Sequence, residues 1–200
     1  MAISMISIAL FVEDNAHESF VRALLGRLER EYGVSFDVSP RSAMRGGDAV
    51  RSEIRQYLTD IRQDRQSLPD LIIIAKDANC QKCATVRREL DAFVNTGLRD
   101  LLVYAIPDPH IERWLLLDSR AFKQALGKGC DSPDLKCARD RYKHQLAQAV
   151  RNAGARPLLG GIEHTDEIVA HMDLEAVAKS DESFREFLHS LRNRLDLLLE

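Results

Sequence analysis

A run of apolar residues that ends in a short acidic turn constrains the fold of this chain more than any other feature. Residues 71–74, LIII, are aliphatic and mostly β-branched, as is typical of a strand that is covered on both faces. The turn that follows contains Asp77, Ala78 and Asn79. Two interpretations are open, a metal site at the end of a buried strand or an ordinary turn, because Asp and Asn are common turn formers.

Strand-like and helix-like patterns alternate through the first half of the chain. The predicted strands are residues 4–12, 34–38, 71–74 and 100–107, and the predicted helices are residues 20–32, 48–65 and 83–94. Residues 39–47, SPRSAMRGG, contain a proline and two glycines and are predicted to form a long basic loop. The alternation predicts an α/β, Rossmann-like fold with a mostly parallel sheet of about four strands flanked by helices.

After residue 109 the pattern becomes helical. The predicted helices are residues 111–117, 119–127, 137–154, 166–177 and 183–199. Because 200 residues with 45% hydrophobic side chains can bury one good core, we expect a core of residues 1–118. We expect residues 119–200 to form a helical region that packs on this core or on a partner. The leucine stripe near the C-terminus would suit an internal core, a homodimer or a contact with a partner subunit.

The charge balance limits the kinds of partner that the chain can have. A net charge of −3 excludes a uniformly basic nucleic-acid-binding surface but allows a local basic patch. No apolar run approaches the roughly 18 residues that a membrane span requires. The N-terminus also lacks the basic region and cleavage site of a signal peptide, so we expect a cytoplasmic protein without a membrane contact.

Acidic residues follow three of the predicted strands. In a parallel sheet these positions meet at one edge, where carboxylates and bound waters can hold a hard cation such as Mg²⁺. The acids at the strand ends are Glu13, Asp14, Asp77 and Asp108, and Glu112 and Asp118 lie close behind on the following helix. His17 and His110 lie close behind two of these strands, where each is either a metal ligand or general acid, or a capping or surface residue.

Four cysteines raise the question of a zinc site. Cys80 and Cys83 have the two-residue spacing of a zinc hairpin, and Cys130 and Cys137 could complete four thiolates. A redox pair at the start of a helix and ordinary free thiols are the alternatives. Disulfides are not expected in a chain of this size without a signal peptide.

Two segments resemble the motifs of TOPRIM-type domains. LFVEDNAHESFVRALLGRL, residues 10–28, is similar to the first motif, in which a strand delivers a Glu to a turn before a helix. LIIIAKDAN, residues 71–79, is similar to the second, in which a later strand delivers Asp-x-Asp. The segment VYAIPDPHIERWLLLD, residues 103–118, resembles a stretch in small stand-alone bacterial TOPRIM-like proteins, several of which accompany ATPases in defence systems.

This resemblance implies a TOPRIM-like fold over residues 4–118 and Mg²⁺- or Mn²⁺-dependent chemistry on phosphodiesters. Glu13 takes the place of the acid/base or metal-ligand Glu, and Asp77 takes the place of the first metal-binding Asp. The sequence departs from the family pattern at Asp14, where Gly is usual, and at Asn79, which replaces the second acid. Asn79 can still ligate a cation through its amide oxygen, but it adds no negative charge.

The resemblance therefore implies a divalent-metal-dependent nuclease or a related phosphodiester-acting protein. We expect it to be the effector subunit of a bacterial anti-phage system that includes an ATPase. Glu13 would orient water, and Asp77 with Asn79 and Glu112 would hold the metal. Two alternatives are open: a catalytically silent module that binds a protein or nucleic acid, and a zinc-stabilised structural protein.

Basic residues supply candidates for phosphate binding. The best candidates are Arg41 and Arg45, which flank a glycine-containing loop, together with Lys76 and Arg113. The stripe of arginines within residues 51–65 is either a further phosphate contact or a solvated helix face. The same two interpretations apply to CARDRYKHQ, residues 137–145.

Overall fold

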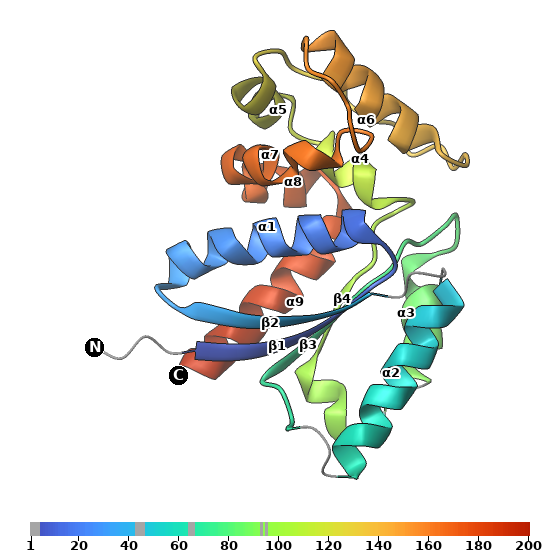
Figure 1. Ribbon diagram of the computed structural model, residues 1–200, viewed down its shortest axis with the longest axis vertical. Helices are drawn as coiled ribbons and strands as arrows, with labels where there is room; N and C mark the ends of the chain where they lie inside the picture. Colours follow the sequence, from blue (N-terminus) through green and yellow to red (C-terminus); the bar gives the residue numbers. More distant parts are fainter. Residues whose placement is uncertain (1–4, 43–46, 64–66, 93, 95) are drawn as a thin grey trace.

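The computed structural model describes residues 5–42, 47–63, 67–92, 94 and 96–200 (Figure 1). The described residues form an α/β fold around one parallel sheet, which confirms the predicted fold class. The sheet consists of β1 (Met5–Val12), β2 (Ser35–Ser42), β3 (Leu71–Ala75) and β4 (Leu102–Ala105). Their order is β2-β1-β3-β4, and all three pairings are parallel.

Helices cover both faces of the sheet. Figure 1 shows α1 (Asn15–Tyr32) and α9 (Glu182–Leu199) on one face, with α2 (Gly47–Arg62) and α3 (Cys83–Asp91) on the other. Side chains alternate along each strand, so neighbouring residues of β1 enter different cores. Leu10 packs with the core of α1 and α9, whereas Phe11 packs with that of α2 and α3. The aliphatic character of β1 and β3 follows from this burial on both sides.

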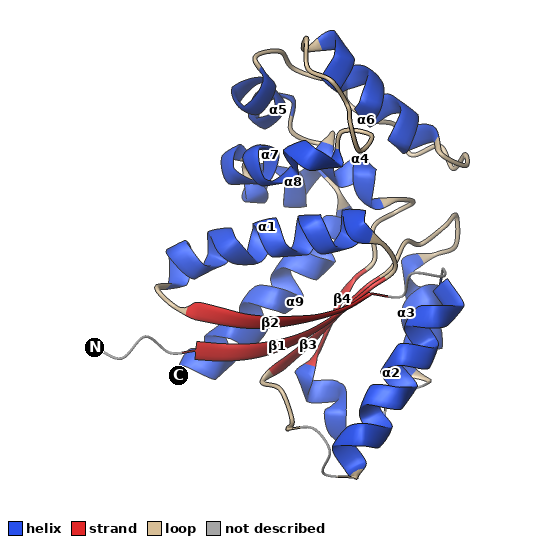
Figure 2. Cartoon of the chain, in the orientation of Figure 1, coloured by secondary structure: helices blue, strands red, loops and turns tan. Residues whose placement is uncertain are grey.

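The described regular structure after β4 is entirely helical, as Figure 2 shows. A 3-10 turn, Thr96–Leu101, leads into β4, and a second, Ile162–His164, precedes α7. The remaining helices are α4 (Ile111–Leu115), α5 (Ser119–Leu126), α6 (Arg141–Asn152), α7 (Thr165–His171) and α8 (Leu174–Ser180). No helix in the described ranges is both long and apolar enough to cross a membrane.

The helical region shares its core with the sheet. Trp114 stacks on Phe187 with ring centroids 5.6 Å apart and meets Phe184 edge-on at 5.3 Å. On its other side Trp114 contacts Phe20 of α1, also at 5.3 Å. Because all four rings are buried, α9 is part of the same hydrophobic core as α1 and the strands.

Several predicted boundaries are wrong. The strand expected from residue 100 begins at Leu102 after a 3-10 turn, and the helix expected from residue 137 begins at Arg141. Two further differences have a local reason. Strand β2 continues to Ser42, because pairing with β1 satisfies the backbone of residues that were expected to form a loop. Pro40 is tolerated there since β2 is an edge strand. Residues 43–46 of the predicted loop lie outside the described residues. The single helix expected over residues 166–177 is two helices, because Asp173 caps α8 by accepting the backbone N–H of Ala176 at 3.0 Å.

Candidate metal centre

Hydrogen bonds donated by backbone N–H groups join the ends of β1 and β3. The N–H of Glu13 donates to the carbonyl of Ala75 at 3.1 Å, which extends the strand pairing by one residue. The N–H of Asp77 then donates to Oε2 of Glu13, also at 3.1 Å. The two acids predicted from separate segments of sequence are therefore neighbours at the carboxyl edge of the sheet.

His17 is held in place by the start of α1. Asp14 is the N-cap, and its Oδ1 accepts the backbone N–H groups of Ala16 and His17. The same oxygen lies 2.7 Å from Nδ1 of the His17 ring, which is completely buried. The cap thereby orients the imidazole so that its Nε2 lies 3.0 Å from Oδ1 of Asp77.

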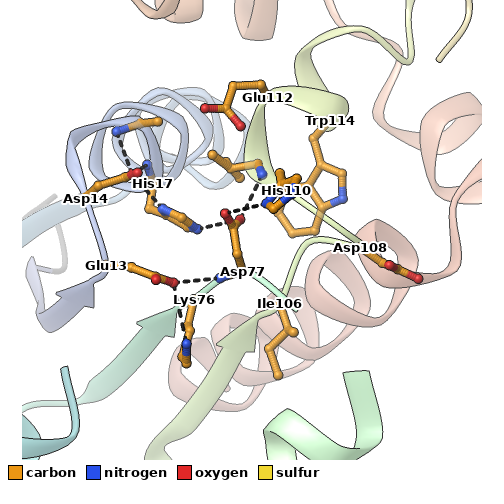
Figure 3. A network of polar contacts seen from close by, with 12 residues as sticks. Glu13, Asp14, His17, Lys76, Asp77, Ile106, Asp108, His110, Glu112 and Trp114 are labelled. Carbon is orange, nitrogen blue, oxygen red and sulfur yellow. Dashed lines mark hydrogen bonds and ion pairs between the residues drawn. The ribbon is translucent and has the colours of Figure 1, made fainter. Parts of the chain in front are cut away.

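The segment after β4 closes the site from the other side. The backbone N–H of Ile111 donates to Oδ1 of Asp77 at 2.9 Å, and Nδ1 of His110 lies 3.0 Å from its Oδ2. Figure 3 shows Asp77 at the centre of this network, with His17 and His110 approaching its carboxylate from different elements. Both oxygens of Asp77 are thus fixed in direction by hydrogen bonds.

Glu13, His17 and Asp77 could together hold a metal ion. Each offers one ligand atom, and these atoms all lie within 4.8 Å of one another. Two carboxylates and one imidazole form a donor set that suits a transition-metal dication such as Mn²⁺ better than Mg²⁺, which favours oxygen ligands. The geometry brings together two of the predicted ligands and adds His17, one of the two histidine candidates.

Charge pairing governs protonation in this network. Burial alone would lower the pKa of His17, but the carboxylates of Asp77 and Asp14 outweigh it and raise the pKa to about 10. Burial would likewise raise the pKa of Asp77, yet the His17 charge and the His110 hydrogen bond hold it well below its usual range. In the metal-free protein at neutral pH, an imidazolium therefore bridges two ionised carboxylates.

Glu112 lies in α4 next to this network, as Figure 3 shows. Its side chain is almost fully buried, and Oε2 has no hydrogen-bond partner among the described residues. Burial and then the charge of Asp77 raise its pKa. Nζ of Lys143 in α6 lies 4.0 Å from Oε1. Nε2 of His110 also lacks a described partner, so two polar atoms in the neighbourhood of Asp77 are buried and unsatisfied.

Two other residues predicted at the strand ends have different contacts. Asn79 has a left-handed backbone, with φ of 49°, and its side chain is exposed. Its backbone N–H bonds the carbonyl of Pro109 at 3.1 Å, so this residue shapes the turn. Asp108 points away from Asp77 in Figure 3, and its N–H bonds Oγ of Ser183 in α9.

The basic residues predicted to bind phosphate have several different environments. Lys76 Nζ lies 3.6 Å from Oε2 of Glu13, beside the centre. Arg41 packs over the ring of Tyr57 in α2, 4.4 Å from its centroid. Arg55 is exposed on α2. Outside the described part of the chain lie Arg45, Arg65 and the side chains of Arg51 and Arg62.

The prediction for Arg113 is wrong. Its guanidinium is buried and forms an ion pair with Asp181. Its Nε donates to the carbonyl of Asp134 at 2.9 Å, and Nη1 lies 3.3 Å from the carbonyl of Asp108. These internal partners occupy the donors that a phosphate would require, so Arg113 joins α4, α9 and the segment before α6.

The four-thiolate zinc site is also wrong, as is the expectation that disulfides are absent. Cys80 and Cys137 form a disulfide, with Cα atoms 5.5 Å apart. Cys83 and Cys130 are free thiols, and burial raises the pKa of each to about 11. The fold brings together two cysteines that are 57 residues apart, which spacing alone could not reveal.

Two contributors to the site were missed as such in the sequence. Asp14 was predicted as a strand-end acid and as a departure from a family pattern, but not as the residue that both caps α1 and binds His17. A capping residue three positions before a histidine is a local signal that would have indicated this pairing. Lys143 gave no such signal, because its proximity to Glu112 depends on the packing of α6 against α4.

Residues 12–192 match the model of a protein family described as a domain of unknown function, DUF4276. The chain belongs to this family. The DUF4276 match includes Glu13, His17, Asp77 and Glu112, and it extends through most of α9. The match therefore covers the helical region as well as β2, β3 and β4, and it begins at the last residue of β1. No curated protein and no solved structure matches the chain significantly.

Proposed function

We propose that the protein is a divalent-metal-dependent phosphodiesterase, a nuclease of the TOPRIM-like kind, with Glu13, His17 and Asp77 as metal ligands. The observation that carries the proposal is the convergence of three ligand atoms within 4.8 Å at the carboxyl edge of a parallel sheet. The likeness of residues 10–28 and 71–79 to the TOPRIM motifs supports the phosphodiester substrate.

A bound Mn²⁺ or Mg²⁺ would polarise a phosphoryl oxygen and lower the pKa of a coordinated water. Mn²⁺ is favoured over Mg²⁺ because one of the three ligands is an imidazole, whereas Mg²⁺ favours oxygen ligands. Metal binding requires a neutral His17 ring nitrogen, so the ion would displace the proton that the metal-free network retains. Asp14 would then fix the ring through Nδ1, as carboxylates do for many metal-ligating histidines.

The chain supplies further groups for proton transfer and charge balance. Glu112, with its raised pKa, is a buried carboxyl that retains a proton more readily than an exposed one and can act as a general acid. Nδ1 of His110 bonds Asp77, whereas its Nε2 has no partner among the described residues. This Nε2 can therefore orient a water or a phosphate oxygen. Lys76 balances part of the charge of Glu13.

An ATPase partner and a role in anti-phage defence are proposed on the resemblance to small bacterial TOPRIM-like proteins. Co-purification with candidate ATPases after co-expression tests the partner directly. A protein that elutes alone after co-expression would contradict it.

One observation favours a second function, that of a catalytically silent binding module. Both ring nitrogens of His17 and both carboxylate oxygens of Asp77 have hydrogen-bond partners without a metal. Such a network is also what a purely structural ion cluster would contain. In this case the edge of the sheet would recognise a partner without cleaving it.

Metal-dependent cleavage distinguishes the two functions. Labelled DNA and RNA are incubated with Mn²⁺ and with wild-type protein, Glu13→Gln or Asp77→Asn. Wild-type cleavage should fall by at least about 100-fold in either variant, as for loss of a metal ligand or its close support. Asp108→Asn, an acid at a strand end but apart from the centre, is the matched control and should retain activity. Equal cleavage by all four proteins would contradict the proposal, and binding without cleavage would favour the silent module.

A further inference from the structure

The segment before and within the first turn of α6 is strongly basic. Residues 136–144, KCARDRYKH, contain four Lys or Arg side chains and one acid, in a chain whose net charge is −3. Such a local excess of positive charge attracts polyanions even when the whole protein is acidic.

Three contacts position this segment beside the candidate metal centre. Cys137 is joined to Cys80, three residues beyond Asp77. The ring of Tyr142 lies 6.2 Å from that of His110. Lys143 approaches Glu112 to 4.0 Å. Of these partners, Cys80 lies in the turn after β3, His110 lies in the turn after β4, and Glu112 lies in α4. The segment therefore runs beside the centre.

One of the four basic side chains stabilises the segment itself, and the other three are exposed and available to bind an anion. Arg141 forms two hydrogen bonds with the carboxylate of Asp134, at 2.7 and 3.1 Å, and so stabilises the segment itself. By contrast, the side chains of Arg139, Lys136 and Lys143 are 96%, 76% and 54% exposed.

Two of the available side chains have only weak, exposed acidic partners. Arg139 meets Asp140 at 3.5 Å, and Lys136 meets Asp134 at 4.0 Å. Such exposed ion pairs contribute little to stability. Their Lys and Arg side chains can therefore readily bind another anion instead. A phosphate chain is such an anion.

We infer that Lys136, Arg139 and Lys143 form a basic wall that holds the phosphates of a nucleic-acid strand against the metal centre. This inference rests on the proposed function, because it names the substrate surface of the same site. The centre itself carries the carboxylates of Glu13, Asp14 and Asp77, which repel a polyanion unless cations nearby compensate. The basic wall supplies those cations beside the turn after β3, to which the Cys80–Cys137 disulfide attaches it.

Binding of a labelled single-stranded DNA oligonucleotide, measured by fluorescence anisotropy in EDTA, tests the wall without cleavage. The double variant Lys136→Glu, Arg139→Glu should lose at least about tenfold in affinity, and its salt dependence should become shallower by about 0.7 for each lost phosphate contact. The matched control is Arg151→Glu, Arg156→Glu, with the same charge change on exposed residues at and beyond the far end of α6.

The control should bind like the wild type. Equal weakening of both double variants, or wild-type binding by the wall variant, would overturn the inference. Calorimetric titration of Mn²⁺ into the same proteins separates this result from the proposed function. If wild-type protein binds Mn²⁺ but the wall variant keeps its DNA affinity, only the wall is wrong. If Mn²⁺ does not bind while DNA binding still depends on the wall, only the metal chemistry is wrong.

Discussion

At His17, burial and two carboxylates act on the protonation of one ring in opposite directions. Burial disfavours the imidazolium, while Asp77 and Asp14 favour it and raise the pKa from 6.5 to about 10. The ring occupies the position between the start of α1 and the end of β3, so one residue joins the two segments that carry the acids. Its charge in the metal-free protein is therefore a stabilising feature of the fold.

Replacing His17 by Gln should lower the free energy of unfolding by about 3–5 kcal/mol, because two buried or half-buried carboxylates lose their cation. The folded pKa is raised, so this contribution is fully present below the unfolded pKa of 6.5 and is lost as the pH rises towards about 10. Urea unfolding of both proteins across this range measures the difference. His144→Gln, an exposed histidine, should show no such pH-dependent difference. A constant gap between wild type and His17→Gln would contradict the assignment.

At the scale of the element, one residue at the start of α1, Asp14, has two structural functions. Asp14 accepts two backbone N–H groups and also fixes the His17 ring. Asp14→Ser keeps a capping oxygen but removes the charge, whereas Asp14→Ala removes both. We expect Asp14→Ala to be less stable than Asp14→Ser by about 1 kcal/mol, the usual contribution of a cap. Urea unfolding curves measure this order, and equal stabilities would show that the cap contributes nothing.

The elements were predictable where local sequence and final environment agree. Strands β1, β3 and β4 were found because their residues are apolar and enter the core on both faces. The end of β2 and the break between α7 and α8 were not found. In the first case pairing with a neighbour overrides the local pattern, and in the second a single cap at Asp173 ends a continuous periodicity.

The candidate site was predictable only in part for the same reason. Glu13 and Asp77 follow apolar strands, and strand ends converge by the rules of parallel sheets. His17 was a candidate because it follows Glu13 closely. The burial of Arg113, the approach of Lys143 and the Cys80–Cys137 pair depend on how α4, α6 and α9 pack, and no local pattern records that packing.

At the scale of the whole molecule, the sheet and the helical region depend on each other. The rings of Phe184 and Phe187 cover Trp114, and Phe184 also reaches Phe20. A chain that ends at residue 118 lacks this cover, and each large apolar side chain returned to water costs about 1.5–3 kcal/mol. Several such losses are comparable to a typical stability of about 5–15 kcal/mol.

We therefore expect residues 1–118 alone to lose cooperative unfolding, whereas the full chain unfolds in one transition. Circular dichroism and thermal unfolding of the two proteins check this. A sharp transition in the shorter chain would show that the sheet with its own helices is an independent domain.

The disulfide gives a second whole-molecule prediction. Of the four cysteines, two should react with a thiol reagent in denatured, unreduced protein, and all four should react after reduction. Cys137→Ser should lower the free energy of unfolding by about 2–4 kcal/mol, because the unfolded chain loses a cross-link. A reductant should destabilise the wild type but leave Cys137→Ser unchanged. Four reactive thiols before reduction would contradict the pairing.

The position of a bound Mn²⁺ is the sharpest test of the proposed metal centre. Crystals soaked in Mn²⁺ and measured for anomalous scattering locate the ion independently of any activity. We predict a peak in direct contact with the side chains of Glu13, His17 and Asp77. A peak at other residues, or none at millimolar Mn²⁺, would contradict it.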